Sequence, residues 1–184
     1  MKAETQWILA EVDGKIASVA PDYRHFAAVA ARIASMKPSE VGSVSTRKLP
    51  TSEVVALSKG LEWEDLLLFG TKFQKSVLKT LFSVTHPGPG RLMSYTDFAA
   101  LCGFPTANRQ VAHVMTINPI AVIIPCHLVV PKESIDRIAE IRAAAESSTL
   151  FRGSDLYLLD TIDVGDYAYG SVIKRDLIKR ELGQ

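Results

Sequence analysis

One pair of adjacent residues in this chain could act together as a nucleophile and its base. Cys126 and His127 follow each other in the segment NPIAVIIPCHLVVP, in a chain that contains only two cysteines and four histidines. The thiolate form of cysteine is a strong nucleophile, and a histidine beside it can accept the thiol proton. The pair therefore indicates covalent chemistry at the sulfur of Cys126.

The apolar residues around Cys126 allow a second interpretation, in which the cysteine only fills the protein core. Free cysteine is among the most buried residue types, and Ala121–Ile124 and Leu128–Val130 resemble short buried strands. Pro125, however, removes a backbone donor directly before the cysteine, so the run is not one uninterrupted central strand. A histidine in so apolar a stretch also needs a polar partner or a surface position. Spacing alone leaves both interpretations open.

Length, composition and charge are those of an ordinary folded protein. The 184 residues, 47% hydrophobic and 22% charged, are enough for one core or for two small lobes. The net charge of +1 means that any surface for nucleic acid must be a local patch. The two cysteines, Cys102 and Cys126, are too few for a disulfide framework or a four-cysteine zinc site.

The chain shows no pattern for export or for membrane insertion. Glu4, Glu11 and Asp13 interrupt any apolar stretch near the N-terminus, and no apolar run approaches the roughly 20 residues that span a bilayer. We therefore expect an intracellular, reducing location, the cytoplasm, nucleoid or nucleus, in which the cysteines remain thiols.

The first part of the chain predicts a small lobe that contains strands. Gln6–Ala20 has apolar segments on both sides of an Asp-Gly pair, which predicts a hairpin. Phe26–Met36 is rich in alanine and has helical spacing, whereas residues 37–60 show little periodicity and predict a loop-rich passage. We place a boundary near Gly70, between an N-terminal lobe (1–69) and a C-terminal domain (70–184).

The C-terminal domain begins with patterns of two helices. Apolar residues spaced for one helix face follow Thr71, and they are Phe73, Val77, Leu78 and Leu81. The segment THPGPG (85–90) then breaks the chain. Ser94, with Asp97 three residues later, forms a capping-box pattern before an apolar helix that Gly103 can end.

A second short helix follows after a tight turn. We expect Thr106 to cap the segment ANRQVAHVM, and Asn118 with Pro119 to terminate it. Its apolar face holds Ala107, Val111, Val114 and Met115, and its polar face holds Asn108, Arg109, Gln110 and His113. Two short helices with a polar, basic outer face form a helix-turn-helix pattern, which is also common in proteins that bind no DNA.

These segments together resemble the O6-alkylguanine-DNA alkyltransferases, repair proteins that use their cysteine once. GTKFQKSVLKTL is similar to the GTPFQ-x-x-VW-x-x-L helix of that family, and MSYTDFA is similar to its SY-x-x-(L/I)A segment. ANRQVAHVMTINPIAVIIPCH resembles, without a gap, the recognition helix, the Asn-Pro hinge and the PCH active site. DYAYGSVIKRDLIKRE resembles the closing segment GY-x-GG-x-x-x-K-x-x-LL-x-x-E.

The resemblance implies a role for each residue that matches the catalytic machinery. Cys126 would accept the alkyl group, His127 would take the thiol proton through a bound water, and Glu181 would hold the histidine. Asn118 would brace the loop ahead of the cysteine, and Tyr95 would donate a proton or a hydrogen bond to the departing guanine. No cofactor or metal is implied, because the thiolate itself is the acceptor.

The resemblance also implies contacts with double-stranded DNA that contains O6-alkylguanine. The reacting carbon is inaccessible inside a stacked duplex, so the nucleotide must be flipped out, and Arg109 would fill the space it leaves. The DNA contacts implied are Ser94, Tyr95, Thr106, Ala107, Arg109 and Gln110. The substrate pocket implied is formed by Met115, Tyr167, Ala168 and Tyr169.

Each matched residue also has a simpler interpretation. Tyr95 is then a core tyrosine with its hydroxyl at the surface, Arg109 a solvated helix arginine and Asn118 a helix cap. Glu181 is then part of an exposed ion-pair face, and we expect the basic cluster of the last helix to be solvated. This cluster consists of Lys174, Arg175, Lys179 and Arg180.

The sequence departs from the family pattern in four places, one of which is the proline-rich segment Phe82–Arg91. Leu128 replaces the arginine of the usual PCHR motif, which the family is thought to use to brace the site. Tyr169 replaces the first glycine of the GG pair, where the substrate base should approach. Residues 131–165 contain an insertion, with KESIDRIAEIRAAAESS predicted to form a helix and a polar stop.

We therefore predict an α/β (α+β) protein with an N-terminal strand-containing lobe and a C-terminal, mostly helical lobe that carries the helix-turn-helix and the cysteine. The predicted function is DNA repair by stoichiometric transfer of an alkyl group to Cys126, in a monomer that acts as a suicide methyltransferase. Two alternatives remain: a sensor that binds alkylated DNA without reacting, and a cysteine-dependent hydrolase of small substrates.

Overall fold

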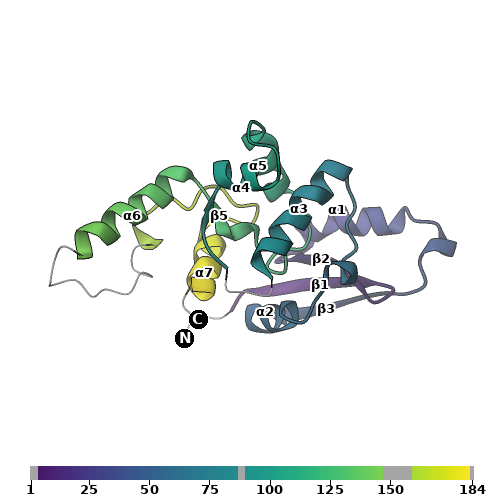
Figure 1. Cartoon of the computed structure of the whole chain (residues 1–184). Helices are drawn as coiled ribbons and strands as arrows, with labels where there is room; N and C mark the ends of the chain where they lie inside the picture. The colour runs from purple at the N-terminus through teal and green to yellow at the C-terminus, as the bar shows by residue number, and fades with distance from the viewer. Residues whose placement is uncertain (1–3, 87–89, 147–158, 183–184) are drawn as a thin grey trace. The chain divides into compact units, whose positions relative to one another are not determined.

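The computed structural model describes residues 4–86, 90–146 and 159–182 (Figure 1). Its contacts divide the chain into two compact units, and each unit contains two separate stretches of sequence. The first unit is Met1–Pro87 with Ile117–Cys126, and the second is Gly88–Thr116 with His127–Gln184. One crossing between the units is therefore the peptide bond that joins Cys126 to His127. These units do not divide at Gly70, where the sequence predicted a boundary. The assignment of separate functions to residues 1–69 and 70–184 stays a prediction.

The first unit is built on the predicted hairpin, which the structure confirms. Strand β1 (Gln6–Val12) pairs antiparallel with β2 (Lys15–Ala20). The two residues of the connecting turn, Asp13 and Gly14, have φ angles of 51° and 77°. Positive φ at both central residues is the geometry that Asp-Gly favours, because its twist matches that of the two strands.

A third strand corrects the prediction of a loop-rich passage over residues 37–60. β3 (Val44–Pro50) pairs antiparallel with β1 along its whole length, in the sheet order β2-β1-β3, and α2 (Thr51–Ser58) follows it directly (Figure 1). A short 3₁₀ turn, η1 (Pro38–Glu40), lies ahead of the strand. β3 is an edge strand and is mostly exposed. It therefore needs no alternation of apolar and polar residues, and its hydrogen bonds come from the backbone, which composition does not reveal.

Two helices complete the outer parts of the first unit. α1 (Tyr23–Ala34), predicted from its alanine-rich pattern, is capped by the Asp22 side chain and buries Val29 and Ile33 against Val12 and Ala17. η2 (Trp63–Asp65) precedes α3 (Lys72–Thr85). Thr71 and Gln74 form a reciprocal capping box at the start of α3, which buries the predicted positions except Phe73, together with Phe82 and Thr85.

The segment that leads to Cys126 is held against the sheet by the backbone of β2. The Val19 N–H donates to the Pro119 carbonyl at 2.8 Å, and the Ala121 N–H donates to the Val19 carbonyl at 3.1 Å. Val19 and Ile120 thereby form a parallel bridge. Buried backbone groups need such partners, so this pairing explains why residues 117–126 belong to the first unit.

The second unit contains the predicted pair of short helices. α4 (Tyr95–Leu101) is capped by Ser94, whose hydroxyl accepts from the Asp97 N–H at 3.0 Å. Gly103, at φ 81°, ends this helix in the left-handed conformation that glycine tolerates. α5 (Asn108–Thr116) follows and packs against α4. β4 (Met93–Ser94) directly precedes α4, and β5 (Val129–Val130) directly follows η3 (Cys126–Leu128). These two short strands pair with each other as a parallel sheet.

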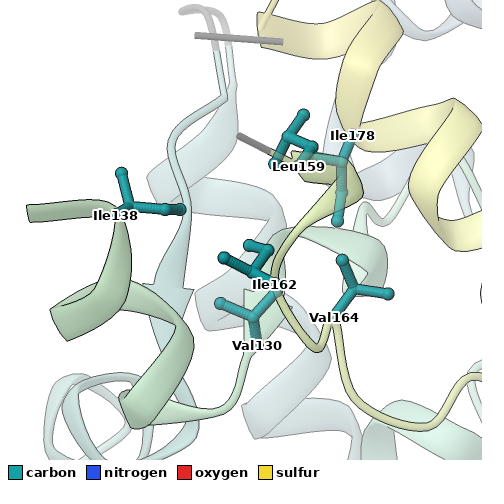
Figure 2. Packing of buried hydrophobic residues seen from close by; sticks show 6 residues of the cluster. All are labelled: Val130, Ile138, Leu159, Ile162, Val164 and Ile178. Atoms are coloured by element: carbon teal, nitrogen blue, oxygen red, sulfur yellow. The ribbon is translucent and has the colours of Figure 1, made fainter. Parts of the chain in front are cut away.

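Two longer helices form the rest of the second unit. α6 (Lys132–Glu146) confirms the helix predicted within the insertion; the predicted polar stop after it lies outside the described residues. α7 (Ser171–Leu182) follows. Figure 2 shows that Ile138 of α6 and Ile178 of α7 belong to one buried cluster, which also contains Val130, Leu159, Ile162 and Val164. The insertion is therefore part of the hydrophobic core of this unit.

Helices and strands together confirm the predicted α+β class. None of the helices in the described part of the chain has the length and apolar character needed to span a membrane.

Candidate active site

Cys126 lies at the end of a loop that its own unit fixes firmly. The side chain is only 2% exposed. The Asn118 amide Nδ2 donates to Cys126 Sγ at 3.1 Å and to the Ile124 carbonyl at 2.8 Å, and its Oδ1 accepts from the Ile120 N–H at 3.1 Å. Asn118 is itself buried. An N–H that donates to sulfur favours the thiolate over the thiol.

The loop between Asn118 and Cys126 turns sharply. Val122 has a φ of 69°, in the left-handed region, which is a rare and costly conformation for a β-branched residue. The Ile124 N–H donates to the Ile120 carbonyl at 2.9 Å, and the Cys126 N–H donates to the Ile124 carbonyl at 2.8 Å. These bonds over-determine the turn, so the strain at Val122 is held by its surroundings. The feature agrees with the prediction, made from Pro125, that the run is not one strand.

His127, the next residue, is buried in the second unit with few polar contacts. It is 1% exposed, and neither ring nitrogen has a hydrogen-bond partner within the described ranges. Glu181 Oε2 lies 3.9 Å from Nε2, an electrostatic contact that is too long for a hydrogen bond. The carboxylate is 24% exposed, so water screens part of its charge.

The surroundings of His127 favour its neutral form. Burial lowers the pKa of the imidazole below its ordinary value of 6.5, because it penalises the charged ring. The Glu181 carboxylate opposes that shift by stabilising the imidazolium, and the positive charge of Lys174 adds to the lowering of the pKa. His127 is therefore neutral at pH 7, and Glu181 is the group that raises its pKa.

Lys174 of α7 is a fully buried cation in the same unit. Its side chain is 0% exposed, and Nζ donates to the Val129 carbonyl at 2.9 Å and to the Asp166 carbonyl at 3.4 Å. The same Nζ lies 5.7 Å from the ring centre of Tyr95 and 6.0 Å from that of Tyr167. Cation–π attraction to two rings and two carbonyl partners compensate for part of the cost of burying the charge.

The prediction that the basic cluster of the last helix is solvated was therefore wrong for Lys174. It was also incomplete for Arg175, whose guanidinium donates twice to the Ile162 carbonyl at 3.2 Å. Lys179 fits the prediction better, in an exposed pair with Asp160 at 2.7 Å. One signal could have identified Lys174: it shares a helix face with the apolar positions 177 and 178 and with position 181.

The predicted pocket residues lie in the second unit with different exposures. Met115 is buried, whereas Tyr167, Ala168 and Tyr169 are half-buried. The Tyr169 ring, at the family's glycine position, meets the Tyr167 ring edge to face, with centroids 5.2 Å apart and planes at 90°. The additional side chain is therefore packed against a neighbouring tyrosine.

The candidate DNA contacts on and around the two short helices α4 and α5 differ in exposure. Arg109 and Gln110 are exposed on α5, opposite its buried face, as predicted. α5 begins at Asn108, so Ala107 and not Thr106 directly precedes the helix; Thr106 is exposed in the turn. Ser94 is buried, and its hydroxyl donates to the Asp97 carboxylate at 2.7 Å while it caps α4. The Ser94 hydroxyl therefore caps α4, and its role as a DNA contact stays a prediction.

The structure thus brings the predicted residues together in two groups. Asn118 and Cys126 meet in the first unit, and His127 and Glu181 meet in the second. The second unit also brings Tyr95 and Tyr167 around Lys174, which the sequence did not predict. Among the described residues, no cluster of three or more His, Cys, Asp or Glu side chains could hold a metal ion.

Comparison with known proteins identifies the segment that contains these helices and the cysteine. Residues 72–144 match the family described as 6-O-methylguanine DNA methyltransferase, DNA binding domain. Over this segment, which is less than half of the chain, the protein is similar to that DNA-binding domain. The matched residues run from α3 into α6 and include Cys126 and His127.

Curated relatives of this family match over a similar length. A probable methylated-DNA–protein-cysteine methyltransferase from Acanthamoeba polyphaga mimivirus is 43% identical over 70 residues, which are 38% of this chain and 45% of that protein. The methylated-DNA–protein-cysteine methyltransferase of Saccharomyces cerevisiae is 41% identical over 63 residues, which are 34% of this chain and 32% of that protein. The matches thus span less than half of these methyltransferases.

A solved methyltransferase shows the same fold over nearly the whole chain. The crystal structure of O6-methylguanine-DNA methyltransferase from Pyrococcus kodakaraensis strain KOD1 superposes with a TM-score of 0.57 at 21% identity. The match covers 98% of this chain and 94% of that protein. The fold likeness therefore extends to the N-terminal lobe.

Proposed function

We propose that this protein repairs DNA by transferring an alkyl group from the O6 position of guanine to Cys126, once per molecule. The segment that matches the methyltransferase DNA-binding domain supports the proposal, because it contains both short helices, the Asn-Pro turn and the Cys-His pair. An intracellular, reducing location is part of the same proposal, since the reaction needs a thiol.

The hydrogen bond from Asn118 to Cys126 is the observation that carries this function. A cysteine that only filled the core would need no polar donor on its sulfur, because it would behave as a small hydrophobe. Here a buried amide places an N–H 3.1 Å from Sγ, and the rest of that amide is held by backbone groups. The arrangement supports a sulfur that carries negative charge.

His127 would take the thiol proton, and Glu181 would stabilise the imidazolium that results. A neutral imidazole is the form that can accept a proton, and the lowered pKa of His127 keeps the ring neutral at pH 7. Glu181, with its oxygen 3.9 Å from the ring, opposes the cost of charging a buried histidine. The pair thus resembles a base and the group that orients it.

The transfer itself balances with the chain's own groups. The thiolate attacks the alkyl carbon, the S–C bond forms as the C–O6 bond breaks, and the bonding pair stays on the guanine. We propose that Tyr95 supplies a proton to the guanine anion. Lys174, 5.7 Å from the Tyr95 ring centre, favours the phenolate that remains after this proton transfer, because a nearby cation stabilises a developing negative charge.

Double-stranded DNA that contains O6-alkylguanine is the proposed substrate, and the monomer is the proposed acting form. Arg109 and Gln110 on the exposed face of α5 are the proposed contacts, and Arg109 would occupy the space of the flipped nucleotide. Arg109→Ala should then slow the reaction with duplex DNA more than the reaction with free O6-benzylguanine. Equal slowing of both would place Arg109 in the fold or in the thiol chemistry.

The decisive experiment is the intact mass of the protein after incubation with one equivalent of DNA that contains O6-methylguanine. We expect the mass of one methyl group, mapped to Cys126, in the wild type and in Cys102→Ser, and no gain in Cys126→Ser. Binding of the DNA without a mass gain would favour the lesion sensor. Continued turnover beyond one equivalent would favour the hydrolase.

A further inference from the structure

Gly90 lies two residues before Leu92 and three before the start of β4, and it lies against Glu181, the residue whose carboxylate faces His127. It is buried, and its φ lies outside the left-handed region, so its backbone conformation is open to any residue. The requirement for glycine at this position is therefore one of space.

A side chain at position 90 would collide with two residues. A Cβ built there would lie 2.8 Å from Glu181 Oε1 and 2.9 Å from Glu181 Cγ, closer than non-bonded carbon atoms approach in proteins. It would also overlap Leu128 Cδ1. Gly90 thus leaves the space in which the side chains of Glu181 and Leu128 lie.

The two side chains that border this space, Leu128 and Glu181, differ in how freely they can move. Leu128 is fully buried, so it moves only with the surrounding core. Glu181 is partly exposed, so its carboxylate has solvent into which it can retreat. A larger residue at position 90 would therefore displace Glu181 in preference to Leu128.

We propose that Gly90 is a positioning residue for the repair chemistry: its missing side chain, with Leu128 as the opposite wall, lets the Glu181 carboxylate reach His127. This inference rests on the proposed function, because it assigns Gly90 to the proposed base. The separation of 3.9 Å between Glu181 Oε2 and His127 Nε2 is already long. A carboxylate pushed further toward water would lose most of its effect on the ring, since water screens it.

Leu128 belongs to the same arrangement. The family pattern has an arginine at this position, and its guanidinium would give the Glu181 carboxylate a cationic partner in addition to protonated His127. Leucine offers none, so the charged groups that act on the His127 ring are Glu181 and Lys174, both from α7. Because Leu128 replaces that arginine, the distance between Glu181 and His127 depends on how the side chains pack around Gly90.

The test is the titration of His127 by NMR in the full chain, with the resonance assigned from a His127→Gln variant. Gly90→Ala should lower the pKa of His127 further, because Glu181 is the group that raises it. It should also slow methyl transfer, by no more than the roughly twofold to fivefold expected when the Glu181 carboxylate is removed, since a weaker base assists proton transfer less. Gly60→Ala is the matched control, because no atom lies within 4 Å of a Cβ at Gly60 and its φ is not positive.

Two double variants decide between positioning and general damage. In a Glu181→Gln background, Gly90→Ala should cause no further change in the pKa of His127, because the carboxylate is already lost. Gly90→Ala/Leu128→Val removes the overlapping Cδ1; it should restore part of the rate, and it carries the test if Gly90→Ala alone does not fold.

An unchanged pKa of His127 in Gly90→Ala, or an equal decrease in the Glu181→Gln background, would overturn the positioning role. The proposed function fails separately, if wild-type protein gains no methyl group while the titration of His127 still responds to Gly90→Ala.

Discussion

The buried side chains on the two sides of the Cys126–His127 peptide bond differ in their hydrogen bonding: Asn118, before it, is well hydrogen-bonded, and the His127 ring, after it, is not. Asn118 makes three hydrogen bonds in the first unit, and one of them is to Cys126. His127 in the second unit has two buried ring nitrogens without a hydrogen-bond partner in the part of the chain that the structure describes, and a carboxylate 3.9 Å away. A firmly held cysteine and a loosely held histidine thus stand next to each other in the sequence.

The difference shows which contacts position Cys126 and which position His127. The thiol side gains it from short-range bonds within eight residues, which fold as one turn. The base side gains it from residues distant in sequence, Gly90, Lys174 and Glu181, whose packing must bring a carboxylate near a buried ring. Changes on the thiol side should therefore cost more stability, and changes on the base side should alter the proton chemistry more selectively.

The largest effect is expected for Asn118→Ala. The change leaves the buried Ile120 N–H without its partner, which costs about 1–3 kcal/mol, and it removes one of the two hydrogen bonds to the Ile124 carbonyl, which is worth about 1 kcal/mol because the Cys126 N–H remains. We expect the free energy of unfolding to fall by about 2–4 kcal/mol in urea titrations, and the alkylation of Cys126 by a probe to slow. Asn118→Asp keeps the acceptor and removes the N–H donor; if it leaves Cys126 as reactive as in the wild type, the hydrogen bond to sulfur has no chemical role.

The second effect concerns the buried cation. Lys174→Met keeps the length of the side chain but leaves the Val129 carbonyl unpaired, so it should lower the free energy of unfolding by about 1–3 kcal/mol. The control is Lys179→Met, which breaks only an exposed pair with Asp160 and should cost at most about 1 kcal/mol. Equal losses in chemical denaturation would mean that Lys174 is solvated, as the sequence had suggested.

The third effect is a dependence of stability on pH that comes from His127. Its pKa in the folded protein lies below the ordinary value of 6.5, so the unfolded chain binds a proton at a higher pH than the folded chain does. The stability should therefore fall as the pH decreases below 6.5, by at most about 1.4 kcal/mol per pH unit for one proton. His127→Gln should reduce this slope in unfolding curves between pH 7 and pH 5; an identical slope would place the proton elsewhere.

The smallest effect is expected for the group that acts only through the histidine. At neutral pH, Cys126 should react with an alkylating probe faster than Cys102, and His127→Ala should remove much of that advantage. Glu181→Gln should slow Cys126 by only about twofold to fivefold, because Glu181 affects the proton through the ring. A larger loss in Glu181→Gln than in His127→Ala would reverse the assigned order of base and supporting group.

The sequence predicted best those features that depend on local chemistry. The Asp13–Gly14 turn, the Ser94 cap and the apolar face of α5 each follow from a few neighbouring residues, and the structure contains all three. β3 was missed because an exposed edge strand carries no apolar alternation. The burial of Lys174 was missed because charge alone predicts solvent, and only its carbonyl and aromatic partners, distant in sequence, allow the cation to be buried.

The candidate site divides in the same way. Cys126, His127 and Asn118 could be chosen from one short segment, and the structure shows the bond from Asn118 to the sulfur. The contribution of Gly90 could not be predicted, because a glycine with an ordinary backbone conformation gives no local signal. Its importance appears only when Glu181 and Leu128 are placed beside it.

The exposed strand β3 has a consequence for the protein in concentrated solution. As the edge of the sheet, it presents backbone donors and acceptors to which a strand of another molecule could bind. Its sequence, VSTRKLP, places Arg47 and Lys48 in the middle of the strand and proline at its end. Arg47 is paired with Glu11 at 3.3 Å, so the repulsion between two such edges comes mainly from Lys48, and proline cannot donate a hydrogen bond to an incoming strand. The polar composition that hid this strand from prediction thus protects the molecule from aggregation through its open edge.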